Sequence, residues 1–319
     1  MKLLITGSIA FDYLMSFPGK FSEHLLADQL QNLSVSFLVD SLNRRRGGCA
    51  GNIAYTLALL EEKPVLVGAV GSDFKGYGEA LACAGVDLSG VHTCDDVFTA
   101  SFFCNTDSDN NQIASFYTGA MQHAREISLA DLKVKEGLAI ISPNDPEAMS
   151  RHAAECRTLG IPFVYDPSQQ IARLDGKTLA ESAKGAKILI VNEYELAMFK
   201  KKTGLDDAGL KTLAEIVIVT LGERGAEIRL PDRDVLIPVA PPEQILDPTG
   251  VGDAFRSGLM KGLSNGLSWE TAGRIGSLAA TYVLETDGPQ SHKYTLREFI
   301  GRFEDLFGPS DEIRSLLAV

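Results

Sequence analysis

The stretch "DPTGVGDAFRSG" (247–258) places two carboxylates among three glycines, directly before an apolar run. Glycine lets the backbone turn sharply and approach a ligand closely. The start of a helix presents unpaired N–H groups at the positive end of the helix dipole. Together these features suit an anion such as a phosphate. We therefore expect the backbone of Gly250, Val251 and Gly252 to form an anion hole.

Asp253 is an acid inside this expected anion site, and an acid there needs a chemical reason. A carboxylate beside a phosphoryl group can orient an attacking hydroxyl and take its proton, while the backbone dipoles stabilise the transferring group. The pattern therefore indicates a general base for phosphoryl transfer. A purely structural alternative is that Thr249 or Asp253 caps the helix after a turn.

Two other glycine motifs do not match the chain. There is no G-x-x-x-x-G-K-[ST] sequence, so a Walker-type phosphate loop is excluded. The dinucleotide fingerprint requires a third glycine where Phe255 stands, and this segment lies late in the chain rather than in a first βαβ unit. We do not expect NAD as a cofactor.

Two segments near the N-terminus carry polar residues that suit a substrate with hydroxyl groups. In "RRRGGCAGNIAYTLALL" (44–60), two glycines precede Asn52, whose amide both donates and accepts hydrogen bonds. In "GSIAFD" (7–12), Asp12 follows the first expected strand and can accept hydrogen bonds from two adjacent ribose hydroxyls. The structural alternatives are a helix cap for Asn52 and an exposed loop acid for Asp12.

Two later segments suit a nucleotide and its metal. "NEYE" (192–195) follows the apolar run "KILIV" and puts Asn192 and Glu195 on one face of a first helical turn. Oxygen ligands there suit a water-bridged Mg²⁺, although a helix cap explains the same residues. "VTLGERGAEI" (219–228) predicts a strand, a glycine turn and a second strand. Such a turn can line a nucleotide phosphate, but hairpins with glycine are common.

The elements that position these residues follow a strand–helix rhythm. Short apolar runs bounded by turns alternate with helical patterns, which predicts an α/β fold with a mostly parallel, doubly wound sheet covered on both faces. From about residue 252 onward the pattern is mostly helical. The expected strands are "KLLIT", "PVLVGAV", "LAIIS", "PFVYD", "KILIV" and "IVIVTL".

Two regions depart from this rhythm and predict antiparallel strands, namely 32–42 and 98–121. The second reads as a hairpin, because the polar tip "NTDSDNN" separates two aromatic-rich arms. We interpret both regions as one small sheet that projects from the main domain as a lid over a substrate cleft. The alternative is an antiparallel extension of the main sheet.

Composition limits the classes of function. The 319-residue chain is long enough for one large domain, and 45% hydrophobic residues support a packed core. The net charge of −12 argues against a nucleic-acid binder, and the one basic run, Arg44-Arg45-Arg46, is too short to change that. This run is more basic than the glycine motif that follows it requires, and the sequence offers no physical reason for it. Five cysteines without a C-x-x-C pair, and no apolar run of the roughly 18 residues that a membrane span needs, predict a cytoplasmic protein.

The motifs together resemble the two signatures of the ribokinase-type (phosphofructokinase-B) carbohydrate kinases, "GGCAGN" near the start and "DPTGVGDAF" near the end. "NEYE" resembles that family's Asn-x-x-Glu motif, and "VTLGERG" resembles its ATP-side strand and turn. Within the family the resemblance is closest to bacterial adenosine kinases, and it extends through the expected lid. It rests there on "TGSIAFDYLMSFPGKFSEHLL", "SFLVD", "QIASFYTGAM", "NDPEAM" and "DPSQQIARL".

The resemblance implies one ribokinase-like catalytic domain over residues 1–319, with a discontinuous β-sheet lid from about 13–45 and 97–121. Asp253 matches the family's catalytic base, and the backbone of residues 250–252 matches its anion hole. The positions that match the nucleoside site are Ser8, Asp12, Ser36, Gly48, Asn52, Phe102, Phe116, Gln169, Gln170 and Arg173. The positions that match the ATP side are Asn192, Thr220, Gly222 and Gly225, with Glu195 as the magnesium ligand.

The implied activity is adenosine kinase, which transfers the γ-phosphoryl of ATP to the ribose 5′-hydroxyl in purine salvage. ATP and Mg²⁺ are the implied co-substrate and cofactor, a K⁺ requirement stays open, and a homodimer through the lid sheet is the implied partner arrangement. Stacking on a base contributes about 1–3 kcal/mol, so Phe102 and Phe116 separate a nucleoside from free ribose if they form a base slot. The alternatives are a kinase for ribose or another sugar, in which these are core residues, and a non-catalytic nucleoside-binding regulator.

Overall fold

The computed structural model describes residues 1–25, 31 and 34–317. A nine-stranded sheet forms its centre, in the order β13-β12-β11-β10-β9-β8-β1-β4-β5. The strands from β11 to β5 in this order are parallel, while β12 pairs antiparallel with both β11 and β13. The strands are β1 (Lys2–Thr6), β4 (Val65–Gly71), β5 (Asp87–Cys94), β8 (Gly137–Ile141), β9 (Phe163–Tyr165), β10 (Ala186–Asn192), β11 (Ala214–Thr220), β12 (Ala226–Arg229) and β13 (Asp234–Ile237).

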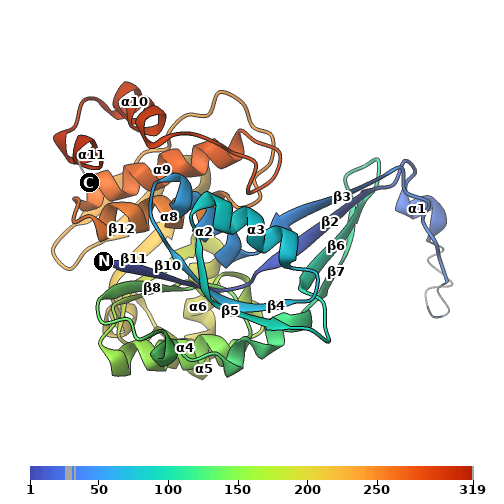
Figure 1. Ribbon diagram of the computed structural model, residues 1–319, viewed down its shortest axis with the longest axis horizontal. Coiled ribbons are helices and arrows are strands. Elements are labelled where there is room, and N and C mark those ends of the chain that lie inside the picture. The colour runs from blue at the N-terminus through green and yellow to red at the C-terminus, as the bar shows by residue number, and fades with distance from the viewer. Residues whose placement is uncertain (26–30, 32–33, 318–319) are drawn as a thin grey trace.

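Helices cover both faces of this sheet (Figure 1). One core contains buried side chains from α2 (Cys49–Leu59), α3 (Lys75–Ala84), α8 (Val251–Ser264) and α9 (Trp269–Leu284). The core on the other face contains those from α4 (Pro146–Leu159), α5 (Gly176–Ala183), α6 (Glu193–Thr203) and α7 (Asp207–Leu213). In β1, Leu3 and Ile5 join the first core and Leu4 the second. This alternation is why the central strands are apolar throughout.

The C-terminal helices α10 (Leu296–Phe307) and α11 (Asp311–Ser315) extend the first layer and share a third core with α9. Short 3₁₀ helices complete the main body: η2 (Gly119–Glu126), η3 (Leu129–Leu132), η4 (Ser168–Ala172) and η5 (Gly222–Arg224). In the part of the chain that the structure describes, no helix is both long and apolar enough to cross a bilayer.

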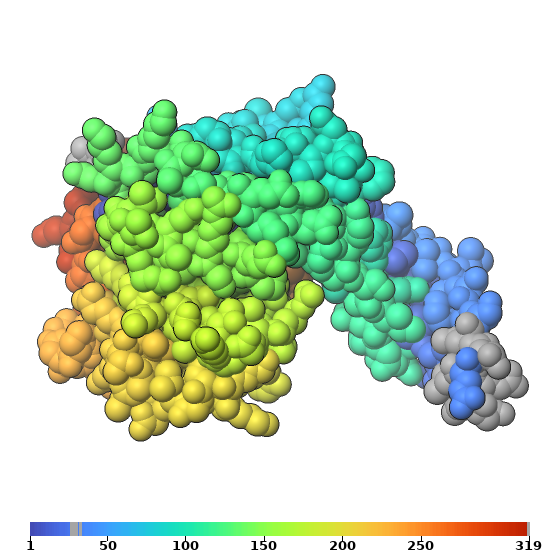
Figure 2. All heavy atoms as spheres, turned by 90° about the horizontal axis from the view of Figure 1, so that it is seen from below, coloured from blue at the N-terminus to red at the C-terminus, as the bar shows by residue number. Residues whose placement is uncertain are grey.

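A separate four-stranded sheet projects from the main body, in the order β3-β2-β6-β7. Its strands are β2 (Ala10–Ser16), β3 (Ser41–Gly47), β6 (Ala100–Thr106) and β7 (Gln112–Tyr117), and α1 (Phe21–His24) lies near its tip. Figure 2 shows this arm standing away from the body, with a notch between the two. Because this sheet is separate, the alternative of an antiparallel extension of the main sheet is wrong. Strands β6 and β7 form the hairpin that the sequence predicts over 98–121.

Two expectations for this lid sheet are wrong. Residues 34–39 form no strand, and the strand begins only at Ser41, so it runs through the basic run rather than before it. Asn32 and Leu33 of the expected strand lie outside the described residues. The sheet is also mixed, because β2 pairs in parallel with β6. Strand β2 begins directly after the turn that follows β1. The segment 7–12, which was expected after the first strand, therefore leads into the lid sheet.

The candidate site residues gather where parallel strands end. Ser8 follows β1, Asp166 follows β9, Asn192 ends β10 and Thr220 ends β11. The chain progresses in opposite directions across the sheet from β1, toward β4 on one side and toward β8 on the other. Open α/β sheets bind ligands at the carboxyl ends of their strands beside such a switch point.

Helices α8 and α9 pack so closely that the first requires glycine. A Cβ built on Gly258 would lie 2.5 Å from the carbonyl oxygen of Ile275 and 2.7 Å from the Cα of Gly276. We expect Gly258→Ala to lower the free energy of unfolding by about 1–3 kcal/mol, because neither backbone atom can move without separating the helices. Urea unfolding followed by circular dichroism measures this loss.

Gly301 in α10 is the matched control, because a Cβ there would meet nothing within 4 Å. Gly301→Ala should raise the stability by up to about 1 kcal/mol, since alanine favours a helix interior. Equal unfolding midpoints for Gly258→Ala and the unmodified protein would contradict this account of the α8–α9 contact.

Candidate active site

Two cavities meet at the first turn of α8. The first, which we call the lid cavity, has a volume of about 570 Å³ and lies between the lid sheet and the ends of β1 and β8. The second, the α9 cavity, has a volume of about 750 Å³ and lies between η5, β13 and α9. Thr249, Gly250 and Asp253 line the lid cavity, while Val251 and Gly252 line the α9 cavity. One turn of backbone therefore faces both cavities.

The backbone at this turn can be formed only with glycine at its start. Gly250 has a left-handed conformation (φ 81°), and a Cβ there would lie 2.5 Å from the Cβ of Pro289. The N–H of Val251 donates to the carbonyl of Pro248 at 3.3 Å, so this amide is already partly engaged. Within the described residues, the N–H groups of Gly250, Gly252 and Asp253 have no hydrogen-bond partner, so they are the ones left for a ligand.

Asp253 is buried at the third position of α8, and a chain of hydrogen bonds fixes its carboxylate. Asn52 Nδ2 donates to Asp253 Oδ2 at 2.9 Å. Gln290 Nε2 donates to Asn52 Oδ1 at 2.9 Å and to the hydroxyl of Tyr77, which in turn donates to the carbonyl of Gly47 at 2.9 Å. Because Gln290 supplies a donor to Asn52, the Asn52 amide can only turn its own donor toward Asp253.

Burial raises the pKa of the Asp253 carboxyl above its usual value, and the charge of Arg256 and the hydrogen bond from Asn52 oppose that rise. Arg256 lies one helical turn further along α8 and pairs with the buried Asp166 at the end of β9, with Nε–Oδ2 and Nη2–Oδ1 distances of 2.6 Å. A raised pKa makes this carboxylate a stronger base toward the proton of a hydroxyl than an exposed aspartate would be.

Asp12 faces the lid cavity from β2. Burial raises its pKa to about 6, and the Arg45 guanidinium opposes this rise while the Asp247 and Asp253 charges add to it. The sheet register places Asp12 opposite Phe102 on one side and Arg45 on the other. The exposed-loop alternative for Asp12 is therefore wrong.

The predicted nucleoside residues that line the lid cavity are Ser8, Asp12, Gly48, Asn52, Phe102, Phe116, Gln169, Gln170 and Arg173. Phe102 and Phe116 are directly paired across the β6–β7 hairpin. Gly48 (φ 86°) requires glycine, because a Cβ there would lie 2.6 Å from Ser8 O and Ala10 N. Ser8 Oγ accepts a hydrogen bond from the N–H of Cys49 at 3.1 Å and so positions the start of α2.

Ser36 does not join this group. It is exposed, lies in the segment without a strand, and lines neither cavity in the described part of the chain. Its expected position rested on a strand over 32–42, and the lid strand begins five residues later.

Comparisons with known proteins decide the family. Residues 19–295 match the pfkB family carbohydrate kinases. The chain belongs to that family. A nucleoside kinase of Methanothermobacter thermautotrophicus is 31% identical over 96% of both chains. The structure of a Burkholderia thailandensis nucleoside kinase in complex with inosine is 39% identical, with a TM-score of 0.85 over 96% of this chain and 98% of that one. A Methanocaldococcus jannaschii nucleoside kinase structure is 25% identical, with a TM-score of 0.84 over 95% and 98%.

Membership in the pfkB family confirms the ribokinase-like α/β fold with its smaller sheet and makes this chain an ATP-dependent kinase. The non-catalytic regulator is thereby set aside. In this kinase the predicted ATP-side residues Thr220, Gly222 and Gly225 line the α9 cavity. Much of the remaining wall is apolar and comes from residues 239–245 and α9, which the motifs did not indicate.

The "NEYE" residues of this pfkB-family kinase form a capping box, so the structural alternative is realised. Asn192 Oδ1 accepts from the N–H of Glu195 and Glu195 Oε2 accepts from the N–H of Asn192, both at 2.8 Å. Glu195 Oε1 accepts only from the hydroxyl of Ser168, at 3.3 Å, within the described residues. These residues contain no cluster of three or more His, Cys, Asp or Glu that could hold a metal by itself. One carboxylate fits a Mg²⁺ that nucleotide phosphates and waters also bind.

Four residues that support Asn52 and Asp253 were missed in the sequence. Gln290 orients Asn52, Tyr77 supports Gln290, and the Arg256–Asp166 pair places a buried positive charge beside Asp253. Arg256 stands three residues after Asp253, so its helical spacing was a usable signal. Gln290 and Tyr77 carried none, because their contacts join segments more than 200 residues apart.

The raised pKa of Asp12 predicts a pH-dependent cost to stability. A carboxyl with a pKa of 3.8 in the unfolded chain and about 6 in the folded protein binds protons more tightly when folded, so stability falls as pH rises from about 4 to about 6. Asp12→Asn should therefore stabilise the protein by roughly 1–3 kcal/mol at pH 8 and by progressively less toward pH 4.5. Urea unfolding at pH 4.5, 6 and 8 measures this difference.

Asp96→Asn is the control, because Asp96 is exposed and lies away from both cavities. It should change the stability by less than about 0.5 kcal/mol at each pH. An Asp12→Asn variant that is no more stable than the unmodified protein at pH 8 would contradict a raised Asp12 pKa.

Proposed function

We propose that this kinase is an adenosine kinase, which transfers the γ-phosphoryl of Mg·ATP to the 5′-hydroxyl of adenosine, giving AMP and ADP in purine salvage. The observation that carries the proposal is the lid cavity, which has Asp12 and Asn52 at polar positions, paired phenylalanines on the lid, and Asp253 where it meets the α9 cavity. Hydroxyl acceptors and a flat apolar wall together suit a nucleoside better than a free sugar.

In the proposed reaction, Asp253 accepts the proton of the 5′-hydroxyl as its oxygen forms a bond to the γ-phosphorus and the bond to the ADP oxygen breaks. The N–H groups of Gly250 and Gly252 from the predicted anion hole, together with that of Asp253 and the α8 dipole, stabilise charge on the transferring phosphoryl. The amide of Asn52 holds the Asp253 carboxylate in one orientation, and substitution of Asn52 would free that carboxylate to rotate. Arg173, at the rim of the lid cavity, is assigned to the phosphate.

The α9 cavity is assigned to ATP, with Thr220, Gly222 and Gly225 along the phosphate side and the apolar wall against the adenine. Asn192 and Glu195 are assigned to the magnesium and phosphate, with Glu195 as the carboxylate ligand. Mg²⁺, when bound, supplies positive charge to the transferring phosphoryl. Omission of K⁺ from the assay tests whether the enzyme also requires a monovalent cation.

ADP release from Mg·ATP tests the substrate, with adenosine, inosine, guanosine, ribose, fructose and fructose 6-phosphate each supplied alone. Inosine is included because the 39%-identical Burkholderia enzyme was solved with it. We expect turnover with adenosine at micromolar concentration and little with the sugars. Efficient turnover with ribose or a fructose and none with adenosine would replace the proposal by a sugar kinase, and Phe102→Ala would then leave the sugar KM nearly unchanged.

Asp253→Asn tests the catalytic base. We expect kcat to fall about 10²–10⁴-fold, equivalent to roughly 3–5 kcal/mol of barrier, because the amide cannot accept the proton. The fold should be retained, since Asn52 can still donate to the amide oxygen. Asp305→Asn, an exposed change on α10, should leave kcat unaltered. Retained activity in Asp253→Asn would contradict the role of this residue.

We also propose that the enzyme forms a homodimer through the outer face of the lid sheet. The register puts Leu42, Phe103, Ile113 and Tyr117 on the face opposite Phe102 and Phe116. Their exposed fractions are 60%, 39%, 44% and 43%. Contiguous exposed apolar side chains of this size typically mark an interface.

The double substitution Phe103→Asp and Ile113→Asp should convert the dimer to a monomer, because it buries two charges in the contact. Size-exclusion chromatography with light scattering measures the mass. Leu236→Asp is the control, since Leu236 is 72% exposed on the far edge strand β13 and should leave the dimer intact. A monomeric unmodified protein at micromolar concentration would refute the lid dimer.

A further inference from the structure

The basic run Arg44-Arg45-Arg46 lies on β3, and strand alternation turns its side chains to opposite faces of the lid. Arg44 lies on the outer face, where its guanidinium is 3.6 Å from the centre of the Phe11 ring and 3.1 Å from Asp73. Arg45 lies on the inner face, in register with Asp12. Arg45 therefore faces the side of the lid that carries Asp12, whereas Arg44 faces the opposite side.

Arg45 joins the lid to two loops that are distant in the sequence. Its Nη1 lies 2.8 Å from Asp247 Oδ2 and its Nη2 lies 2.5 Å from Asp287 Oδ1. The side chains of Arg45 and Asp247 are only 22% and 15% exposed, whereas Asp287 is 73% exposed. The contact with Asp247 is thus the better shielded of the two, and a shielded ion pair holds its geometry more strongly than an exposed one.

Asp247 begins the turn that leads into the anion hole. Its Oδ1 accepts a hydrogen bond from the N–H of Thr249 at 2.8 Å, directly before Gly250. Arg45 takes the other oxygen of the same carboxylate. The two oxygens therefore connect a lid strand to the backbone of the expected phosphate site.

The loop 287–290 makes a second connection between Arg45 and the active site, and each of its four residues contributes a contact. Asp287 pairs with Arg45, and Gly288 lies so close that a Cβ there would be 3.2 Å from Arg45 Cδ. Pro289 packs against Gly250, and Gln290 donates to Asn52. Four consecutive residues thus run from Arg45 to the anion hole and to the amide that orients Asp253.

We propose that Arg45 is a positioning residue that couples the lid sheet to the anion hole and the base, so that a lid seated over its substrate fixes the catalytic turn. The proposal rests on the proposed function, since it assigns the lid cavity to the acceptor. The reacting atoms do not touch Arg45. It acts through Asp247 on one path and through the loop 287–290 on the other, and both paths end at the first turn of α8.

Among the residues that the structure describes, Arg45 is the one positive charge in the set of groups whose charges shift the pKa of Asp12. Asp247 from the turn and Asp253 from α8 carry negative charges that raise the pKa of Asp12, while Arg45 on β3 lowers it. Tyr77 on α3, the remaining titratable neighbour, is neutral near pH 7 because burial raises its pKa further. Removal of Arg45 should therefore move the ionisation of Asp12 to higher pH as well as loosen the turn.

The test is the pH profile of kcat and of kcat/KM for adenosine in Arg45→Ala, Arg45→Lys and the unmodified enzyme. We expect kcat of Arg45→Ala to fall about 10–100-fold, because small misplacement of a catalytic group costs up to that much. The acid limb of kcat/KM should move upward by about one pH unit as the Asp12 pKa rises. Arg45→Lys should restore the acid limb but only part of kcat, since one ammonium cannot hold both carboxylates in a fixed fork.

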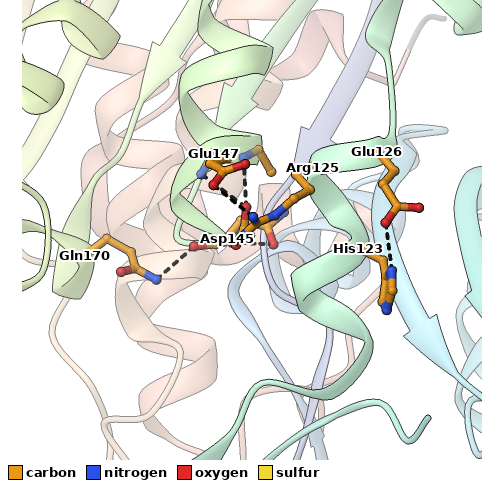
Figure 3. A network of polar contacts seen from close by, with 8 residues as sticks. His123, Arg125, Glu126, Asp145, Glu147 and Gln170 are labelled. Carbon is orange, nitrogen blue, oxygen red and sulfur yellow. Dashed lines mark hydrogen bonds and ion pairs between the residues drawn. The ribbon is translucent and has the colours of Figure 1, made fainter.

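Arg125 provides a matched control, because it also bridges one buried and one exposed carboxylate (Figure 3). It pairs with Asp145, 7% exposed, and Glu147, 70% exposed, and it lines neither cavity in the described part of the chain. Arg125→Ala should therefore lower thermal stability as much as Arg45→Ala while leaving kcat and the pH profile unchanged.

The outcomes separate this proposal from the proposed function. An unmodified enzyme without adenosine turnover would contradict adenosine kinase, and the same three variants would then be measured with whichever acceptor in the panel is used. Normal adenosine turnover with kcat of Arg45→Ala within threefold and an unmoved acid limb would overturn the role of Arg45. If Arg45→Ala does not fold, Arg45→Gln, which removes the charge but keeps a polar side chain with an NH₂ donor, decides the acid limb in the same way.

Discussion

The structure depends on a carboxylate, Asp253, held in a buried position between two cavities. An ionised acid with little access to water is costly to form, and the cost falls when hydrogen bonds and a positive charge face it. Here the amide of Asn52 and the charge of Arg256 supply both. Because the pKa of Asp253 still shifts upward, its carboxylate is more basic than an exposed aspartate, which suits the proposed role in proton abstraction.

Each of these supports depends on a further layer of the fold. Arg256 is itself buried, and it is tolerated because Asp166 at the end of β9 faces it from 2.6 Å, with the Ser142 hydroxyl donating to the same carboxylate. Asn52 is oriented by Gln290 and, behind it, Tyr77. The base is thus connected to one strand of the central sheet, to α3 and to the loop before α10. A site assembled in this way needs the whole domain to be folded before it has any chemistry.

The sequence was informative where function depends on one local stretch. The turn at Gly250 and the helix start near Asp253 could be predicted because a glycine turn and an acid follow one another within four residues, while the roles of both residues stay predictions. The β6–β7 hairpin was visible because a polar tip separates two aromatic arms. The parallel strands were visible because both of their faces are buried, which makes them apolar at every position.

The sequence was misleading where neighbours come from elsewhere in the chain. The lid strand was predicted over 32–42, but the strand that forms, β3, contains three consecutive arginines. Arginines are tolerated there because one face meets the Phe11 ring and Asp73, and the other meets Asp247 and Asp287. None of these partners could be known from local periodicity, since the pairs span between 29 and 242 residues.

The same long-range contacts connect the lid sheet to the turn before α8 and to Asp253. A sheet that only covered a cleft would need apolar contacts to its ligand and a flexible attachment. This sheet instead carries Asp12 and Phe102 on the face toward the cavity, and its edge strand holds the carboxylate that begins the anion-hole turn. A displacement of β3 would therefore change the environment of Asp12 and the backbone of Gly250 together. Under the proposed role of Arg45, binding of the acceptor beneath the lid and formation of the phosphate site are coupled through these contacts, which would favour transfer to the acceptor over transfer to water.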